Sequence, residues 1–242
     1  MRYPIPPFIK EHLRRALEFV GISRYSRLGK YNLDFILEAY LPTKGVFLEV
    51  GAIDGLYASN TYYLERMRGW SGILIEPVPY FFRECVRHRK KSKVFNCALV
   101  SSDYKHPTVP MVFASCGETA VKSTTSPDGE KRSDKNKQRA TEHGRYEFDA
   151  PARTLTSVLE EAGVSEIDFF SLDVEGYEIQ VLSGLDMVRF RPKWLLVECL
   201  TPESKAGMQD FLSARNYEFV AQVTPRDLLW RTAEPRVSIG PE

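Results

Sequence analysis

FLEVGAIDG (residues 47–55) joins a continuously apolar run to a turn that contains two glycines and an aspartate. Four more apolar runs follow along the chain: GILIE at 72–76, KVFNCALV at 93–100, IDFFSLDV at 167–174 and WLLVEC at 194–199. Strands this continuously apolar are buried on both faces, as they are in a parallel sheet covered by helices. Because helical patterns separate the runs, the sequence predicts an α/β fold of the doubly wound class.

The end of the chain breaks this alternation. YEFVAQV at 217–223 and DLLWRT at 227–232 are separated by a turn too short for a parallel crossover, so we expect the two runs to pair antiparallel. Residues 115–150 are polar and show neither the helical nor the strand period. This segment is therefore expected to be a mobile insertion without regular structure.

Two amphipathic patterns precede the first apolar run. The pattern at 7–20 predicts a helix that docks through one apolar face, formed by Phe8, Ile9, Leu13, Leu17 and Val20. The pattern at 31–40 predicts a second helix. We therefore divide the chain into an N-terminal helical flank, residues 1–44, and one domain, residues 45–242, that carries the polar insertion.

Composition narrows the possible partners and location. The 242 residues are 43% hydrophobic, which is enough for one large core, and the formal net charge of +1 gives no field that would draw the protein to nucleic acid or an anionic membrane. No run approaches the roughly 18 to 20 apolar residues of a membrane span, and the start of the chain lacks a secretory leader pattern. The four cysteines form no C-x-x-C pair, so we expect a soluble protein of the reducing cytoplasm.

Candidate site residues stand at the ends of the apolar runs, because ligands of a doubly wound sheet lie beyond the carboxyl ends of its strands. The first run gives Glu49 and a turn from Gly51 to Gly55, before a helix expected at about 57–67. The second run ends in Glu76, twenty-five residues after Gly51, about where an acid accepts hydrogen bonds from ribose hydroxyls. The alternative is an ordinary tight turn, with Glu76 ending a strand in water.

The residues of this turn favour a cofactor that contains adenosine but no phosphate. The G-x-G-x-x-G spacing that cradles a pyrophosphate is absent. Carboxylates at Glu49 and Asp54 would repel a pyrophosphate, whereas they tolerate the sulfonium and ammonium groups of S-adenosylmethionine. The turn therefore points to S-adenosylmethionine.

Two later strand ends supply further candidates. Asn96, Cys97 and Ala98 have the size and polarity to flank an adenine ring, although a plain core strand explains them equally well. Asp173 and Glu175 stand at a strand-to-helix corner, where Asp173 would face the methionine moiety and Glu175 would orient or deprotonate an acceptor hydroxyl. The alternative is structural, with Asp173 as a helix N-cap and Glu175 as a favourable first-turn charge.

Taken together, these motifs resemble the FkbM family of S-adenosylmethionine-dependent methyltransferases over about residues 45–232. The motifs are FLEVGAIDG at 47–55, SNTYYLE at 59–65, GILIEPVPYFF at 72–82, NCALVS at 96–101, RTLTSVLEEAG at 153–163 and IDFFSLDVEGYEIQVLSG at 167–184. The resemblance implies the class I methyltransferase fold, a mostly parallel seven-stranded Rossmann-like sheet with helices on both faces and an antiparallel C-terminal hairpin. It also implies O-methylation of a sugar, a polyketide or a related natural product.

The resemblance assigns roles by position, with Gly51 to Gly55 as the cofactor turn, Glu76 as the ribose acid and Asp173 near the methyl donor. Ile53 stands where an asparagine is common in the family. The complete set of expected cofactor-binding residues is Glu49, Gly51, Ala52, Asp54, Gly55, Asn60, Glu76, Pro77, Asn96, Cys97, Ala98 and Asp173. No metal site is predicted, and a divalent ion beside Asp173 and Glu175 is a lesser alternative that some sugar methyltransferases suggest.

The expected partner is a small-molecule or sugar acceptor. RHRKKSK at 87–93 lacks interleaved aromatic residues, and it is better explained as a solvated helix end than as a nucleic-acid patch. The motifs of nucleobase methyltransferases are also missing, so a nucleic-acid substrate ranks third. The runner-up is a catalytically silent nucleotide-fold module that binds a ligand or a partner protein. The sequence gives no oligomeric state.

Overall fold

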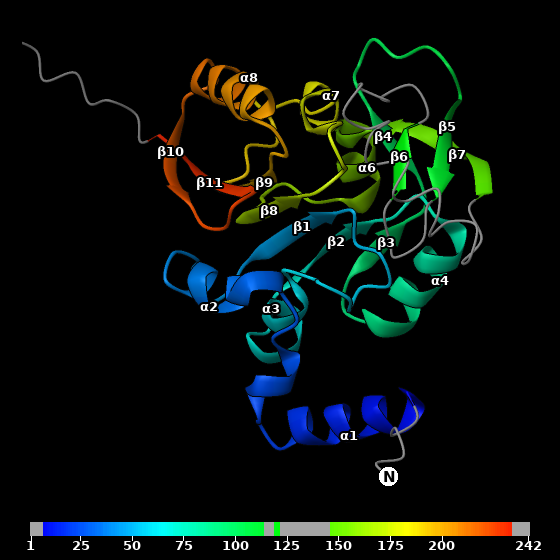
Figure 1. The fold of residues 1–242 in the computed structure, drawn as a ribbon, viewed down its shortest axis with the longest axis vertical. Helices are drawn as coiled ribbons and strands as arrows, with labels where there is room; N and C mark the ends of the chain where they lie inside the picture. The colour runs from blue at the N-terminus through cyan, green and yellow to red at the C-terminus, as the bar shows by residue number, and fades with distance from the viewer. Residues whose placement is uncertain (1–6, 114–118, 122–145, 234–242) are drawn as a thin grey trace, which may run out of the picture.

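The central sheet has seven strands in the order β10-β11-β9-β8-β1-β2-β3 (Figure 1). The computed structural model that shows it describes residues 7–113, 119–121 and 146–233. The strands are β1 (Val46–Val50), β2 (Ser71–Ile75), β3 (Lys93–Phe95), β8 (Phe169–Leu172), β9 (Trp194–Glu198), β10 (Tyr217–Gln222) and β11 (Asp227–Thr232). β11 runs antiparallel to both β9 and β10, whereas the other neighbouring pairs are parallel. The predicted parallel sheet with an antiparallel C-terminal hairpin is confirmed.

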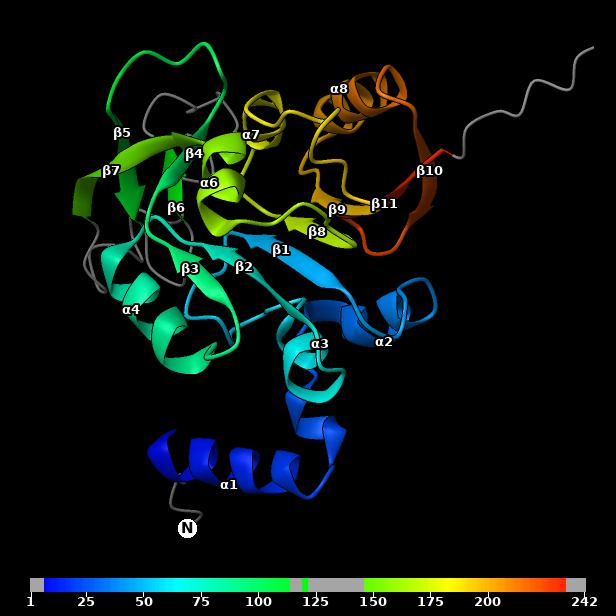
Figure 2. The same ribbon diagram turned by 180° about the vertical axis from the view of Figure 1, so that it is seen from behind.

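Helices cover both faces of this sheet, as Figures 1 and 2 show from opposite sides. Alternate residues of a strand point to opposite faces, so in β1 Leu48 packs into the core under one set of helices and Phe47 into the core under the other. The first set is α6 (Leu155–Ala162), α7 (Glu178–Ser183) and α8 (Pro202–Ser213). The second set is α2 (Leu33–Glu38), α3 (Tyr62–Met67) and α4 (Pro79–His88). Burial on both faces explains why the strands are continuously apolar.

The first helix, α1 (Pro7–Phe19), lies outside these layers, beyond α3 and α4 (Figure 1). It is held by polar contacts: buried Glu18 accepts hydrogen bonds from the Tyr62 hydroxyl at 3.1 Å and from Arg66 Nε at 2.8 Å. Leu13 and Val20, which we expected on the docking face, are 52% and 68% exposed. The helix is confirmed, but docking through those two residues is wrong, because the face that carries Glu18 packs against α3, where Glu18 forms an ion pair with Arg66.

A second sheet of four strands has the order β4-β7-β5-β6. Its strands are β4 (Ala98–Val100), β5 (Thr108–Phe113), β6 (Thr119–Val121) and β7 (Tyr146–Thr154). The run at 93–100, expected to be one strand, is interrupted at Asn96 and Cys97, so that β3 joins the central sheet and β4 joins β7.

The polar segment at 115–150 was expected to lack regular structure. This is wrong for β6 and for the first half of β7, which both pair with β5. Backbone hydrogen bonds hold these strands, and side-chain periodicity does not report such bonds. Residues 114–118 and 122–145 lie outside the described part, so the expected mobility is not addressed.

The sequence predicted no membrane span and no paired cysteines. No helix in the described ranges is long and apolar enough to cross a membrane. Cys85, Cys97 and Cys199 are buried free thiols, and Cys116 lies outside the described residues.

Candidate active site

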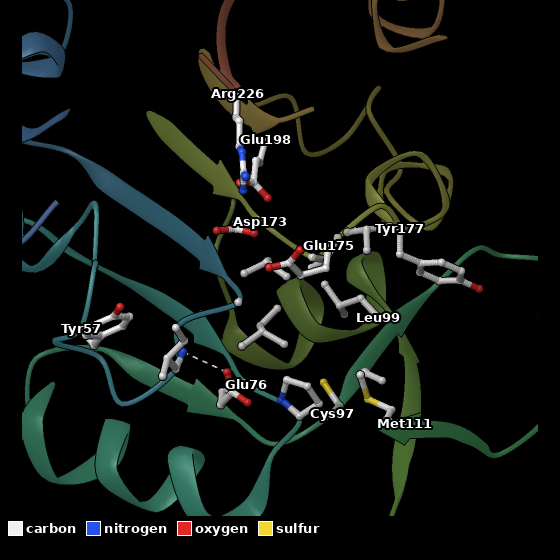
Figure 3. A pocket seen from close by; sticks show the side chains of 18 of the residues that line it. Tyr57, Glu76, Cys97, Leu99, Met111, Asp173, Glu175, Tyr177, Glu198 and Arg226 are labelled. Carbon is white, nitrogen blue, oxygen red and sulfur yellow. Dashed lines mark hydrogen bonds and ion pairs between the residues drawn. The ribbon is translucent and has the colours of Figure 1, made fainter. Parts of the chain in front are cut away.

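A pocket of about 230 Å³ opens at the carboxyl ends of β1, β2, β8 and β9, the edge where a doubly wound sheet binds its ligands (Figure 3). The structure brings together seven of the predicted site residues on its walls: Gly51, Glu76, Pro77, Cys97, Ala98, Asp173 and Glu175. Six others are not among the described lining residues: Glu49, Ala52, Asp54, Gly55, Asn60 and Asn96.

Gly51 connects β1 to the pocket in a left-handed conformation, with φ at +85°. A Cβ atom at this position would lie 2.0 Å from the carbonyl oxygen of Asp173. Only glycine therefore allows the turn after β1 to approach the end of β8 so closely. This approach places the glycine turn beside the acid that follows β8.

Glu76 is the most enclosed of the lining acids, with 3% of its surface exposed. Its Oε2 accepts a hydrogen bond from the backbone N–H of Ile53 at 2.9 Å, and its Oε1 accepts one from Val78 at 2.8 Å. Burial raises the pKa of Glu76 to about 8, against these hydrogen bonds, which lower it. Asn96 donates from Nδ2 to the carbonyls of Glu76 and Pro77, so it positions this wall from behind.

Glu49 lies behind the pocket, where it forms a buried network of hydrogen bonds. Its carboxylate accepts hydrogen bonds from the hydroxyls of Ser59 and Thr61 and from the backbone N–H of Asn60, and it pairs with Arg89 at 3.2 Å. Asn60 donates its side-chain amide to Ser171 of β8 at 3.1 Å. These contacts tie the segment after the glycine turn to the central strands.

Asp54 organises the turn itself. Its Oδ1 accepts the backbone N–H groups of Leu56 at 2.9 Å and Tyr57 at 2.6 Å. The chain is still in a turn at Tyr57, and the helix expected to start at about this residue begins at Tyr62.

Ile53 has φ at +50°, a left-handed conformation that is strained for a β-branched residue. We expect Ile53→Asn to raise the free energy of unfolding by about 1 kcal/mol, because asparagine tolerates this conformation. In a chain of this size the melting temperature should rise by about 2 to 4 °C. Ile53→Val keeps the β-branch and is the control that should show no gain; an equal rise in both variants would contradict the strain.

Three acids meet at the opposite end of the pocket from Glu76. One carboxyl oxygen from each of Asp173, Glu175 and Glu198 lies within 4.8 Å of the others (Figure 3). Arg226 Nη1 stands 3.5 Å from Glu198 Oε1. Glu198 was not among the residues selected from the sequence, although it is the last polar residue of the apolar run at 194–199 and ends β9.

The capping of helix α7 tests the structural alternative for Asp173 and Glu175. Helix α7 begins at Glu178 with Tyr177 as its N-cap, and no side-chain capping bond is formed there. Glu178 itself accepts the backbone N–H groups of Val174 and Gly176 at 3.3 and 3.0 Å. Asp173 is therefore not the N-cap, and Glu178 supplies the first-turn charge that we had considered for Glu175.

Other lining residues were not selected from the sequence, among them Lys30, Tyr57, Met111, Tyr177 and Arg226. Lys30 belongs to the N-terminal flank and stands over the ring of Tyr57, 5.6 Å from its centroid. No local motif marks such residues, because elements distant in the chain bring them to the pocket. The N-terminal flank thus takes part in the site.

Comparison with protein families matches residues 49–219 to the methyltransferase FkbM domain. The chain belongs to the FkbM methyltransferase family. An FkbM methyltransferase from Methylobacillus flagellatus KT is similar in structure, with 13% sequence identity and a TM-score of 0.50 over 86% of this chain and 50% of that chain. A TehB-like S-adenosylmethionine-dependent methyltransferase from Corynebacterium glutamicum has 10% identity and a TM-score of 0.46 over 95% and 100% of the two chains. No curated protein matches the sequence.

These findings confirm the family resemblance and the class I methyltransferase fold of this FkbM-family protein. The chain spans half the length of the FkbM structure, and at 13% identity that likeness shows the fold alone. The family implies S-adenosylmethionine as the cofactor. The pocket fits it, because four carboxyl groups on its walls disfavour a pyrophosphate and suit a cation. The comparisons give no support for a divalent ion.

Proposed function

We propose that this FkbM-family protein transfers a methyl group from S-adenosylmethionine to a hydroxyl oxygen of a sugar or another small molecule. The observation that carries the proposal is that acidic side chains lie at both ends of one pocket. The buried carboxyl group of Glu76 is at one end, and the three acids Asp173, Glu175 and Glu198 are at the other. Between them, the Gly51 turn lets the backbone approach a ligand closely. In-line methyl transfer requires chiefly such positioning.

In this proposal the cofactor lies along the carboxyl edge of the sheet. Glu76 binds the ribose hydroxyls, while Pro77, Cys97 and Ala98 flank the adenine. The methionine end then extends past Gly51 toward Asp173. Glu175 orients the acceptor hydroxyl at this end of the pocket. One of the acids that meet there takes the proton of that hydroxyl when it is ionised and within hydrogen-bond reach.

The surface chemistry supports a small acceptor over nucleic acid. In the basic run at 87–93, Arg89 is buried and Lys93 donates to the carbonyl of Ala162 at 2.6 Å. Arg87 pairs with Glu84 at 2.8 Å. The run therefore offers few uncommitted cations to a phosphate backbone. A cytoplasmic location is part of the proposal, since the buried free thiols suit a reducing compartment.

Glu76→Gln should weaken S-adenosylmethionine binding about 2- to 12-fold, equivalent to about 0.5 to 1.5 kcal/mol for a hydrogen bond between neutral groups, because Glu76 holds its proton up to about pH 8. The substitution keeps the size of the side chain, so the pocket should keep its shape. Calorimetric titration of both proteins with S-adenosylmethionine and S-adenosylhomocysteine measures the effect. Equal affinities in the two proteins would remove Glu76 from the cofactor site.

The raised pKa of Glu76 predicts a pH dependence of stability. The folded protein holds this proton up to about pH 8, whereas the unfolded chain releases it near the ordinary value of 4.5. The Glu76 contribution to the unfolding free energy is therefore lost as the pH rises between these values, by at most about 1.4 kcal/mol per pH unit. Melting temperatures at pH 5 and pH 8 should show Glu76→Gln gaining on the wild type at pH 8. A pH-independent difference would contradict this.

The activity itself is tested by incubating the protein with S-adenosylmethionine and a panel of hydroxylated sugars and natural products. Formation of S-adenosylhomocysteine together with a methylated acceptor supports the proposal. Cofactor binding without turnover on any acceptor favours the silent binding module. Failure to bind either nucleoside at millimolar concentration would exclude both functions.

A further inference from the structure

Two acids from neighbouring strands face each other at the acceptor end of the pocket. Asp173 directly follows β8 and Glu198 ends β9, and the parallel pairing of these strands brings both residues to the same edge of the sheet. Figure 3 shows Glu198 between Arg226 and Asp173, with its carboxyl group directed toward Asp173. One carboxyl oxygen of each acid lies within 4.8 Å of one oxygen of the other.

A shared proton would stabilise this arrangement. An ionised carboxylate only accepts hydrogen bonds, so two neighbouring carboxyl groups can be bonded to each other only when one of them is protonated. Glu198 Oε1 faces Arg226 Nη1 at 3.5 Å, while Oε2 is buried and receives no hydrogen bond from the donors of the described residues. Oε2 is therefore the oxygen of Glu198 that can share a proton with Asp173.

The charges around the pair favour Asp173 as the proton carrier. The side chain of Asp173 is exposed to the pocket, and the protein around it removes part of its hydration, which raises its pKa well above the ordinary value. The negative charges of Glu198, Glu175 and Glu178 raise the pKa further. Among the described cations, Arg226 pairs with Glu198 and Lys30 lines the same pocket.

We propose that Asp173 and Glu198 share one proton in the cofactor-free protein and release it when S-adenosylmethionine binds, so that the methyl donor creates the carboxylate that accepts the proton of the acceptor. The inference rests on the proposed function. The pocket runs from Glu76 to this pair, so a donor with its ribose at Glu76 brings its sulfonium to the pair. A positive charge there favours the ionised form.

In the methyl transfer, the pair of Asp173 and Glu198 takes up the proton that the acceptor loses. The acceptor oxygen forms a bond to the methyl carbon, while the carbon–sulfur bond breaks and its electron pair stays on sulfur. The hydroxyl proton passes to the ionised carboxylate. The product, S-adenosylhomocysteine, is a neutral thioether at sulfur, so it lies beside a pair that again holds one proton. Donor and product therefore differ in the protonation state that they favour.

This difference is measurable without knowing the acceptor. Calorimetric titrations at pH 7 in phosphate and in Tris, whose ionisation enthalpies differ, give the number of protons exchanged with each ligand. We expect S-adenosylmethionine to release up to about one proton more than S-adenosylhomocysteine. Any proton exchange at Glu76 is common to both ligands, because both carry the ribose, and Glu76→Gln should leave the difference between them unchanged.

Glu198→Gln and Asp173→Asn each remove one member of the pair, and in both variants the difference in proton release should disappear when each ligand is titrated to saturation. Melting curves verify that the variants are folded, and two independent substitutions guard against the failure of one. Equal proton exchange for the two ligands in the wild type, or a difference that survives in both variants, would overturn the inference and leave methyl transfer intact. Absence of binding by either ligand would instead count against the proposed function.

Discussion

Gly51→Ala should abolish S-adenosylmethionine binding and lower the free energy of unfolding by about 3 kcal/mol or more. Two costs combine at this position. The left-handed φ of +85° strains any residue with a Cβ atom, by about 1 to 3 kcal/mol. The new methyl group would also stand 2.0 Å from the carbonyl oxygen of Asp173, in backbone that cannot rotate away. Separating the ends of β1 and β8 would open the wall on which the proposed cofactor lies.

Gly163→Ala provides a matched control for the first of these costs. Gly163 ends α6 with φ at +66°, and a Cβ atom there would meet nothing within 4 Å. This control should lose only about 1 kcal/mol and keep its affinity for S-adenosylmethionine. Thermal melts and calorimetry on both variants separate strain from collision. If the two variants lose the same stability and both still bind the cofactor, the close approach to Asp173 is not important.

The pocket could be predicted from the sequence wherever a residue ends an apolar run. Gly51, Glu76 and Asp173 were all found in this way, because the carboxyl end of a buried strand is both a local signal and the place where a doubly wound sheet binds ligands. The same rule applied to the run at 194–199 yields Glu198. Glu198 could therefore have been predicted from the sequence, because it stands at the end of an apolar run as Glu76 does.

Other features could not be predicted because they depend on contacts between distant segments. Glu49 is an expected cofactor residue of the first motif, and the sequence does not show that its position also depends on Arg89, forty residues away. Lys30 reaches the pocket from the N-terminal flank. The polar strand β7 is held by backbone pairing with β5, which leaves no trace in side-chain periodicity. Local sequence patterns therefore predicted the central sheet and the edge at which it binds ligands. They did not predict the second sheet, which is seen only in the structure.

Arg89→Met should cause the second large loss of stability, because it removes a cation from a group of buried charges. Arg89 is fully buried at the end of α4, and its guanidinium lies 2.9 Å from Glu65 and 3.2 Å from Glu49. It also donates to the carbonyl of Gly55 at 3.2 Å. Arg89→Met would leave two buried carboxylates without a cation, which costs about 3 to 5 kcal/mol. Melting should occur roughly 10 °C lower or more.

A second substitution should reveal whether the unpaired carboxylates cause the loss of stability. Adding Glu65→Gln to Arg89→Met should recover part of the loss, because one of the two orphaned charges is then absent. The control is Arg87→Met, which removes an exposed ion pair with Glu84 and should cost at most about 1 kcal/mol.

Binding should decline together with stability in Arg89→Met, although Arg89 is not among the described lining residues of the pocket. The guanidinium holds the carbonyl of Gly55 and the hydroxyls of Ser59 and Thr61. It therefore fixes the segment that carries the glycine turn. Calorimetry below the melting temperature of the variant should show weaker binding of S-adenosylmethionine, and Arg89→Met/Glu65→Gln should not restore it. If the affinity is unchanged, the turn is held by β1 and Asp54 alone, and the buried charges serve only the stability of the fold.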